Sequence, residues 1–325
     1  MREIIFLEPV FKSMIWGGNK LATEFGYSIP SDHTGECWAI SAHKNGDCTI
    51  KNGIYAGKSL SWLWSNHREL FGGATGDEFP LLVKIIDAKA DLSIQVHPDD
   101  NYANANENGA LGKTECWYVL DCEKDGKIVI GHNAKNKSEL KDMITADRWQ
   151  ELIKVRPVKK GNFFQINPGT VHAIKAGTVI LETQQSSDIT YRLYDYGRLD
   201  NGRPRELHIE KSIDVIHCPH IDNEVRGKVL KSRTSEVEEL IRCSFYTVIK
   251  VSLHGEQEFS QNDQFLNISI IDGEGEIDGV RVKKGDHFIL PAGYGTFRLK
   301  GNMELIESHI TRLEREDAAG ENRRG

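Results

Sequence analysis

The sequence has no surplus of positive charge and no feature of a secreted or membrane-spanning chain. It carries 41 Lys and Arg residues against 48 Asp and Glu residues, for a formal net charge of −7. Because a basic excess is what attracts polyanions, we predict no nucleic-acid partner. No stretch reaches the roughly 18 apolar residues that a membrane helix needs, and the opening MREIIFLEPVFK lacks the apolar run of a secretory signal. We therefore predict a cytoplasmic protein that does not contact membranes.

The sequence also lacks paired cysteines. Six cysteines are present, and none belongs to a C-x-x-C motif. This excludes a disulfide-dense scaffold and a zinc ribbon. Hydrophobic residues make up 39% of the 325 residues, which is enough for a core in one large or two modest domains.

Short apolar runs separated by Gly, Asn, Asp and Lys fill most of the chain, a pattern typical of many short strands. Three segments have apolar residues at helical spacing instead, and they lie near 58–71, 137–154 and 204–216. We predict a mainly β fold with helical insertions.

Two segments far apart in the chain are similar. Residues 158–169 read VKKGNFFQINPG and residues 282–293 read VKKGDHFILPAG. A repeat at this distance predicts two related β-domains. The position of His172 after the first copy is taken by Thr296 after the second, so only the first domain would hold a metal site.

We accordingly predict three parts of the chain. Residues 1–235 would form a metal-binding catalytic domain that includes the helical segments. Residues 236–315 would form a C-terminal domain without metal ligands, and residues 316–325 a flexible tail.

Four residues of the first part are candidate metal ligands. In Gln95-Val96-His97 the strand alternation places Gln95 and His97 on one face. Glu115 begins the next apolar run, and His172 follows the turn signal Pro168-Gly169. Two imidazoles and a carboxylate are a common catalytic zinc set that leaves one position open, and a Gln oxygen could complete it.

Six separated motifs in this order resemble the type I phosphomannose isomerases, the zinc-dependent mannose-6-phosphate isomerase family of the cupin superfamily. They are IWGG (15–18), GECWAIS (35–41), IQVHP (94–98), GKTE (112–115), PGTVHA (168–173) and LETQQSSDITYRLYDYGR (181–198). The resemblance extends from about residue 6 to residue 215. It implies two cupin or jelly-roll β-barrel domains, one zinc ion per chain, and a sugar phosphate as partner. It further implies interconversion of mannose 6-phosphate and fructose 6-phosphate through a cis-enediol.

The resemblance assigns Gln95, His97, Glu115 and His172 to the metal, and it also implies catalytic residues. Lys84 lies in an apolar strand, where a charge needs a partner or a site. Lys113 precedes Glu115 by two residues and should share its face. The planar guanidinium group of Arg192 suits a phosphate or an enediolate oxygen.

Further residues complete the predicted pocket. Glu182 is a fourth catalytic candidate, and Asp188 a substrate-binding one; either could orient Arg192 or carry a proton. Trp16 and Trp38 are also predicted to bind substrate, because the C–H face of a sugar packs well on an indole.

Two other functions remain open at this point. One is a metal cupin that binds a sugar without turnover, although the retained Lys84, Lys113, Glu182 and Arg192 exceed what simple binding needs. The other is an iron(II) oxygenase using the same two-His, one-carboxylate set. The sequence is compatible with a monomer or a homodimer.

Overall fold

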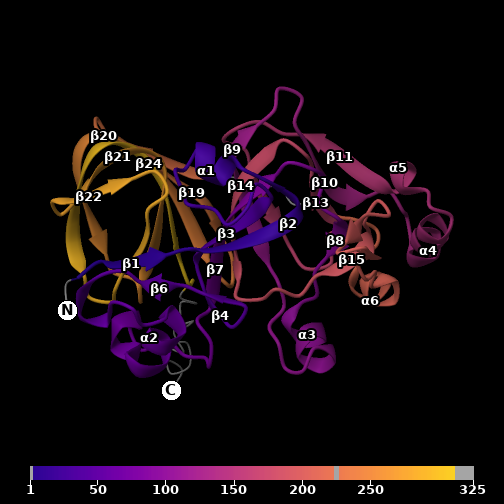
Figure 1. Ribbon diagram of the computed structural model, residues 1–325, viewed down its shortest axis with the longest axis horizontal. Coiled ribbons are helices and arrows are strands. Elements are labelled where there is room, and N and C mark those ends of the chain that lie inside the picture. Colours follow the sequence, from indigo (N-terminus) through magenta and orange to yellow (C-terminus); the bar gives the residue numbers. More distant parts are fainter. Residues whose placement is uncertain (1–2, 223–226, 312–325) are drawn as a thin grey trace, which may run out of the picture.

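A computed structural model of the chain describes residues 3–222 and 227–311 (Figure 1). The predicted tail at 316–325 lies outside the described residues. The fold is mainly β, with helices confined to connections, as predicted. No helix among the described residues is long and apolar enough to cross a membrane.

Short helices occupy the segments between strands. Their bounds are α1 (Lys20–Thr23), α2 (Leu60–Asn66), α3 (Asp100–Asn106), α4 (Lys137–Thr145), α5 (Trp149–Leu152) and α6 (Ile209–Val215), with 3-10 turns at Gly53–Tyr55 and Arg68–Phe71. The segment predicted as helix near 137–154 contains α4 and α5, and Ile153 already begins a strand.

The helix expected near 204–216 starts later than predicted. Pro204 belongs to a small hairpin of β16 (Leu199–Asp200) and β17 (Arg203–Pro204), and α6 begins only at Ile209. The turn residues Asn201 and Gly202 both have positive φ, at 51° and 78°. Asn-Gly is the preferred pair for such a two-residue hairpin turn, and this local signal overrides the helical spacing.

Two sheets face each other around the predicted site; we call them the site sheets. The six-stranded one has the order β12-β9-β14-β7-β2-β3 and the five-stranded one β11-β10-β13-β8-β15. The strands of the first are β2 (Val10–Gly18), β3 (Thr34–Ile40), β7 (Leu81–Ala88), β9 (Glu115–Cys122), β12 (Phe163–Ile166) and β14 (Thr178–Gln185). Those of the second are β8 (Ile94–Val96), β10 (Lys127–His132), β11 (Ile153–Pro157), β13 (His172–Ile174) and β15 (Tyr191–Tyr194).

A nine-stranded sheet, here the C-terminal sheet, forms the other half of the molecule; most of it is drawn in orange and yellow in Figure 1, while its strands β1 and β6 are indigo to purple. Its order is β18-β19-β20-β24-β21-β23-β1-β6, with β22 paired to β21. The bounds are β1 (Ile5–Glu8), β6 (Thr49–Ile50), β18 (Lys228–Lys231), β19 (Ser235–Arg242), β20 (Thr247–Gln261), β21 (Leu266–Ile277), β22 (Val280–Lys283), β23 (His287–Leu290) and β24 (Gly295–His309). The remaining strands β4 (Ala42–His43) and β5 (Gly46–Asp47) form a hairpin.

The strand orders of all three large sheets are open paths rather than closed rings. The cupin architecture is therefore built here from sheets packed face to face. β1 crosses from the N-terminal end of the chain to pair with β23, so the first strand belongs to the C-terminal sheet.

The two copies of the repeated motif fold alike. In each copy a glycine with positive φ precedes the strand, Gly161 at 86° and Gly285 at 91°, because the tight turn needs a left-handed residue. The strand is β12 in the first copy and β23 in the second. The repeat thus marks the same turn–strand–turn unit twice.

Alternation along the strands separates two environments. On β7 all eight residues are buried, because both faces of this sheet are covered. Val83 and Ile85 pack in a core that continues to Ile289 and Ile306 of the C-terminal sheet. Lys84, between them, points to the opposite face, where the site lies.

Candidate metal centre and active site

A row of four side chains crosses the six-stranded site sheet. The register pairs Trp38 of β3 with Lys84 of β7, Lys84 with Glu182 of β14, and Glu182 with Trp117 of β9. Residues paired directly across strands share a face. Their side chains therefore lie beside one another although they come from four separate segments.

A second row crosses the five-stranded site sheet, which faces the first. Arg192 of β15 pairs with Gln95 of β8, and Gln95 pairs with His172 of β13. The face-to-face packing of the site sheets brings the two rows to one pocket, lined by Lys84, Glu182, Gln95 and Arg192 among others.

Three predicted ligands converge between the sheets. His97, Glu115 and His172 each offer a ligand atom, and these atoms all lie within 4.8 Å of one another. The two Nε2 atoms are 3.1 Å apart, and the Glu115 oxygens lie 3.5 Å from His97 and 3.4 Å from His172. The exposed fractions of the three side chains are 1% or less, so their ligand atoms are shielded from bulk water.

Both imidazoles are oriented by a backbone carbonyl. Nδ1 of His97 lies 2.7 Å from the Ile189 carbonyl oxygen, and Nδ1 of His172 lies 2.8 Å from that of Thr170. Donation from Nδ1–H fixes the tautomer that leaves the Nε2 lone pair free, as metal-binding histidines require. Burial lowers the pKa of His172 to about 4 and that of His97 well below its usual value. Neutral imidazoles and a carboxylate fit a divalent metal ion.

Gln95 lies beside the three. Its side-chain Nε2 is 3.3 Å from Nε2 of His172, and its Oε1 is 3.3 Å from the Ser93 hydroxyl, which donates to it. A half-turn of this amide would direct its oxygen toward the cluster. Ligation by Gln95 stays a prediction.

Lys113 connects the cluster to the pocket. Its Nζ lies 2.7 Å from Glu115 Oε2, 3.3 Å from His97 Nε2 and 3.8 Å from Glu182 Oε1. Burial alone would lower the pKa of Lys113, but the Glu115 and Glu182 charges raise it overall. Burial and the Glu182 charge raise the pKa of Glu115 to about 7, while Lys113 acts in the opposite direction. The group is a paired charge cluster, as burial of charge demands.

Glu182 is held on three sides. Its Oε1 is 3.5 Å from Nζ of Lys84, and its Oε2 accepts a 3.1 Å hydrogen bond from the Trp117 indole. The same indole N–H also lies 3.1 Å from Glu115 Oε1. Burial would raise the pKa of Glu182, but Lys113 and Lys84 lower it overall. The two neighbouring lysines therefore favour the charged form of Glu182.

The predicted substrate-binding residues also line the pocket. Trp16 and Trp38 are buried, and Lys84 lies over the Trp38 ring at 4.8 Å from its centroid. Asp188 accepts a 2.5 Å hydrogen bond from the Asn45 amide, and its Oδ1 lies 3.6 Å from His43. All eleven site residues from the sequence thus lie in the metal cluster or in this pocket.

Several pocket residues were not singled out from the sequence. Glu36 binds the Trp38 indole at 2.7 Å, and Trp117 bridges the two carboxylates. Both follow a recognisable signal, since each is two residues from a chosen residue on the same strand. Arg205 also lines the pocket and forms two hydrogen bonds to Asp195. It comes from the segment after the hairpin, which no local pattern connects to the site.

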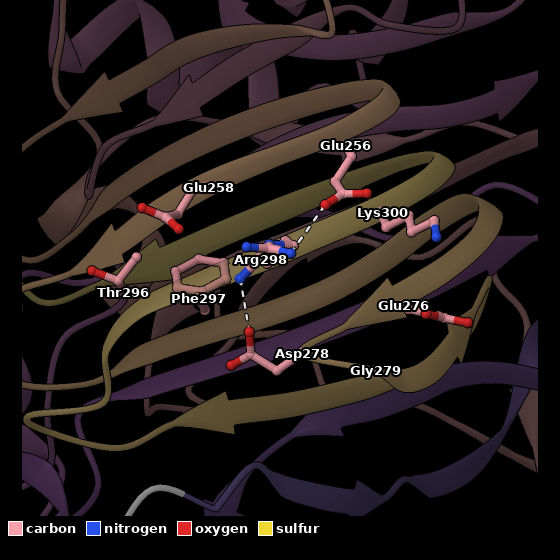
Figure 2. Close-up of a pocket in the computed structure, with 9 residues that line it drawn as sticks. All are labelled: Glu256, Glu258, Glu276, Asp278, Gly279, Thr296, Phe297, Arg298 and Lys300. Atoms are coloured by element: carbon pink, nitrogen blue, oxygen red, sulfur yellow. Dashed lines mark hydrogen bonds and ion pairs between the residues drawn. The ribbon is translucent and has the colours of Figure 1, made fainter.

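The C-terminal sheet carries a different hollow on its outer face (Figure 2). There Glu258 of β20 pairs with Arg298 of β24, and Glu256 with Lys300. Arg298 forms an ion pair with Glu256 at 3.2 Å, and both side chains are about half exposed. Thr296, the counterpart of His172 in the repeat, lies in this exposed hollow. No His, Cys, Asp or Glu group elsewhere in the described residues is arranged to hold a metal ion.

Comparison with known proteins gives a consistent result. Residues 4–120 match the family described as phosphomannose isomerase type I, catalytic domain, and residues 236–310 match the mannose-6-phosphate isomerase cupin domain. The chain is 53% identical over 315 residues to the mannose-6-phosphate isomerase ManA of Bacillus subtilis, covering 95% of this chain and 99% of that protein. It is 47% identical over 314 residues to the mannose-6-phosphate isomerase of Streptococcus mutans, covering 95% and 99%. The crystal structure of mannose 6-phosphate isomerase from Bacillus subtilis superimposes with a TM-score of 0.93 at 49% identity, covering 94% and 99%.

Proposed function

Since the chain belongs to the type I mannose-6-phosphate isomerase family, we propose that it is a zinc-dependent aldose–ketose isomerase. It would interconvert mannose 6-phosphate and fructose 6-phosphate through a cis-enediol. The observation that carries the proposal is the convergence of His97, Glu115 and His172 next to a buried, charged pocket. Curated relatives with about half of the residues identical are named for this reaction.

We propose zinc as the metal, one ion per chain, held by His97, Glu115 and His172 with Gln95 as a fourth ligand. Bound zinc would act as a Lewis acid that polarises the sugar oxygens at C1 and C2. The nitrogen-rich donor set supports zinc over calcium or magnesium, which prefer oxygen ligands. The remaining steps depend on the side chains of the pocket.

The reaction moves one proton between C2 and C1, and one between their oxygens. Glu182 is the proposed carrier of the carbon-bound proton, because it is buried, because Lys113 and Lys84 lower its pKa, and because Lys84 and Trp117 hold it in one orientation. The ammonium groups of Lys84 and Lys113 would donate hydrogen bonds to the oxygens on which negative charge develops.

The phosphate group of the substrate needs a cation in the pocket. Arg192 is the proposed group: its side chain lines the pocket and forms no ion pair within the described parts of the chain. Its guanidinium is free to form a two-point contact with a phosphate. Trp16 and Trp38 would contact the sugar face, and Asp188 a hydroxyl group.

We also propose that residues 1–235 form the catalytic domain and 236–315 a structural one, because the pocket residues from Met14 to Arg205 all precede the boundary. Strands β1, β6 and β18 of the first part pair with the C-terminal sheet. A cytoplasmic location and a monomeric or homodimeric state stay predictions from the sequence.

A coupled assay of fructose 6-phosphate formation from mannose 6-phosphate tests the proposal. The protein is assayed as purified, after removal of metal by a chelator, and after addition of zinc or of iron(II) in separate samples. We expect activity that disappears with the chelator and returns with zinc.

Two results would contradict the proposal. Stoichiometric zinc without turnover would indicate a sugar-binding protein rather than an isomerase. Activity restored by iron(II) and not by zinc would refute the assigned metal while leaving the isomerase reaction in place.

A further inference from the structure

The segment that precedes the Glu115 strand is fixed at every residue from 111 to 114. The Leu111 carbonyl accepts a 2.9 Å hydrogen bond from the Ser187 hydroxyl, and the Lys113 amide donates to the Pro98 carbonyl at 3.0 Å. Neither the spacing of the metal motif nor the pocket itself requires these contacts. They join the segment to residues that follow His97 on one side and strand β14 on the other.

Gln185 and Asp100 hold the two neighbours of Lys113. Gln185 Oε1 accepts from the Thr114 amide at 2.9 Å, and Gln185 Nε2 donates to Asp100 Oδ1 at 3.0 Å. The same Asp100 oxygen accepts from the Gly112 amide at 2.7 Å. The backbone N–H of Gln185 also donates to the Thr114 carbonyl at 3.0 Å. One connected set of hydrogen bonds therefore encloses Lys113 on both sides.

The packing leaves this segment little freedom. A β-carbon added at Gly112 would lie 2.4 Å from the Asp99 carbonyl carbon and 2.5 Å from the Asp100 nitrogen, so the segment lies directly against the start of α3. Gln185 and Thr114 are 5% and 3% exposed. Water is thus largely excluded from the hydrogen bonds of Gln185, and an unmatched donor or acceptor there would be costly.

We propose that Gln185, together with Asp100, is a positioning residue for Lys113. The two side chains clamp the backbone on both sides of Lys113 and so aim its ammonium group between Glu115 and Glu182. The inference rests on the proposed function, since it takes Lys113 to act in turnover. Gln185 itself points away from the pocket and would not contact the substrate.

The expected consequence of loosening the clamp is a loss of rate rather than of binding. A displacement of about 1 Å in a reacting group can cost about 100-fold in rate. Arg192 and the two tryptophans come from other segments, so contact with the substrate would be retained. We expect kcat to fall about 10- to 100-fold with KM changed by less than about threefold.

The test compares three variants. Gln185→Glu keeps the size of the side chain but places an acceptor opposite the Asp100 oxygen, and Asp100→Ala removes that oxygen. Asp100→Asn is the conservative change, because its amide oxygen can still accept both hydrogen bonds. The matched control is Gln261→Glu, another buried glutamine, whose Nε2 donates to the Leu290 and Pro291 carbonyls in the C-terminal sheet.

Each variant is measured for kcat and KM, bound zinc, melting temperature, and amide hydrogen exchange of peptides that cover 108–116. We expect Gln185→Glu and Asp100→Ala to lose exchange protection in these peptides and to lose kcat, with zinc content unchanged. Asp100→Asn should match the unaltered protein, and Gln261→Glu should keep both kcat and the protection of 108–116.

The outcomes separate the two proposals. Faster exchange without loss of kcat would overturn the positioning role, and so would loss of zinc in proportion to activity or equal damage by Asp100→Asn and Asp100→Ala. Unchanged exchange in Gln185→Glu would overturn the clamp itself. Absence of turnover in the unaltered, zinc-loaded protein would refute the proposed function instead, while exchange still decides whether the clamp exists.

Discussion

The site sheets and the C-terminal sheet are both built from antiparallel strands, but they differ in the side chains that they bury. Between the site sheets lie Lys84, Lys113, Glu115 and Glu182, all nearly inaccessible to water. The C-terminal sheet instead encloses an apolar cluster that contains Val251, Leu253, Ile268, Ile270, Phe288, Phe297, Leu299, Met303 and Leu305. Charged residues such as Glu256 and Arg298 lie on its outer face (Figure 2), and Glu307 is a buried exception.

The difference shows what a buried site demands of its surroundings. Buried charge is tolerated only when it is paired and hydrogen-bonded, and Lys84, Lys113, Glu115 and Glu182 form ion pairs with one another. An apolar interior needs only volume and shape. The site sheets therefore need specific contacts around each charged group, whereas the C-terminal sheet can supply stability through packing.

The largest effect separates two buried histidines. His172→Ala should remove a metal ligand and lower kcat/KM about 1,000-fold or more, since the loss of several kcal/mol of charge stabilisation has that effect. His287→Ala should lower stability only, because that imidazole contacts Ser269 and Tyr27 and no site residue. Zinc content and kcat/KM of both variants check this. Equal loss of zinc in both variants would show that His172 is not a specific metal ligand.

A second change tests the apolar half. Phe297 is 2% exposed and packs against Tyr294 and Phe259. Phe297→Ala should lower the free energy of unfolding by about 3–5 kcal/mol through the cavity it leaves. Urea unfolding measures this, and kcat at a temperature where the variant stays folded should be unchanged. A folded variant with reduced kcat would show that the C-terminal sheet contributes to the site.

A third prediction concerns the one carboxyl buried in the C-terminal sheet without an ion-pair partner among the described residues. Burial and the nearby Asp263 raise the pKa of Glu307 to about 7, from 4.5 in an exposed setting. Between these pH values the folded protein keeps a proton that the unfolded chain has released. The free energy of unfolding should therefore fall as pH rises from about 4.5 to about 7 and then level off.

Glu307→Gln removes this dependence. At pH 8 the variant should be more stable than the unaltered protein by up to about 3 kcal/mol, and at pH 4.5 the two should be alike. Urea unfolding of both proteins between pH 4.5 and pH 8 measures this, and the change in the free energy of unfolding with pH is compared between the two. Parallel pH profiles would show that Glu307 does not titrate in the folded state as its burial indicates.

The smallest effect is expected on the outer face of the C-terminal sheet. Arg298→Ala removes the exposed ion pair with Glu256 and should change the free energy of unfolding by less than about 1 kcal/mol. It should leave zinc content and kcat unchanged. A clear loss of activity would mean that the hollow in Figure 2 affects the site, and that the C-terminal sheet does more than stabilise the fold.

Local patterns in the sequence were enough for much of the site. Lys113 and Glu115 point to the same site, as their two-residue spacing predicts, although the strand begins only at Glu115. The charge of Lys84 in an apolar strand correctly predicts a buried partner, Glu182. The repeat correctly indicates a second turn–strand–turn unit. It did not show that Thr296 would face solvent, because the direction of a side chain depends on how β24 pairs with its neighbours.

The sequence by itself determined the fold class and the set of candidate site residues, because strand alternation, turn glycines and motif order are local properties of the chain. Only the tertiary structure decided how strands pair. The register of β3, β7, β14 and β9 brings Trp38, Lys84, Glu182 and Trp117 into one row. The clamp of Gln185 on the Lys113 segment and the place of β1 in the C-terminal sheet depend on the same long-range pairing. Such pairing is set by the burial of whole faces at once, which no short stretch of sequence encodes.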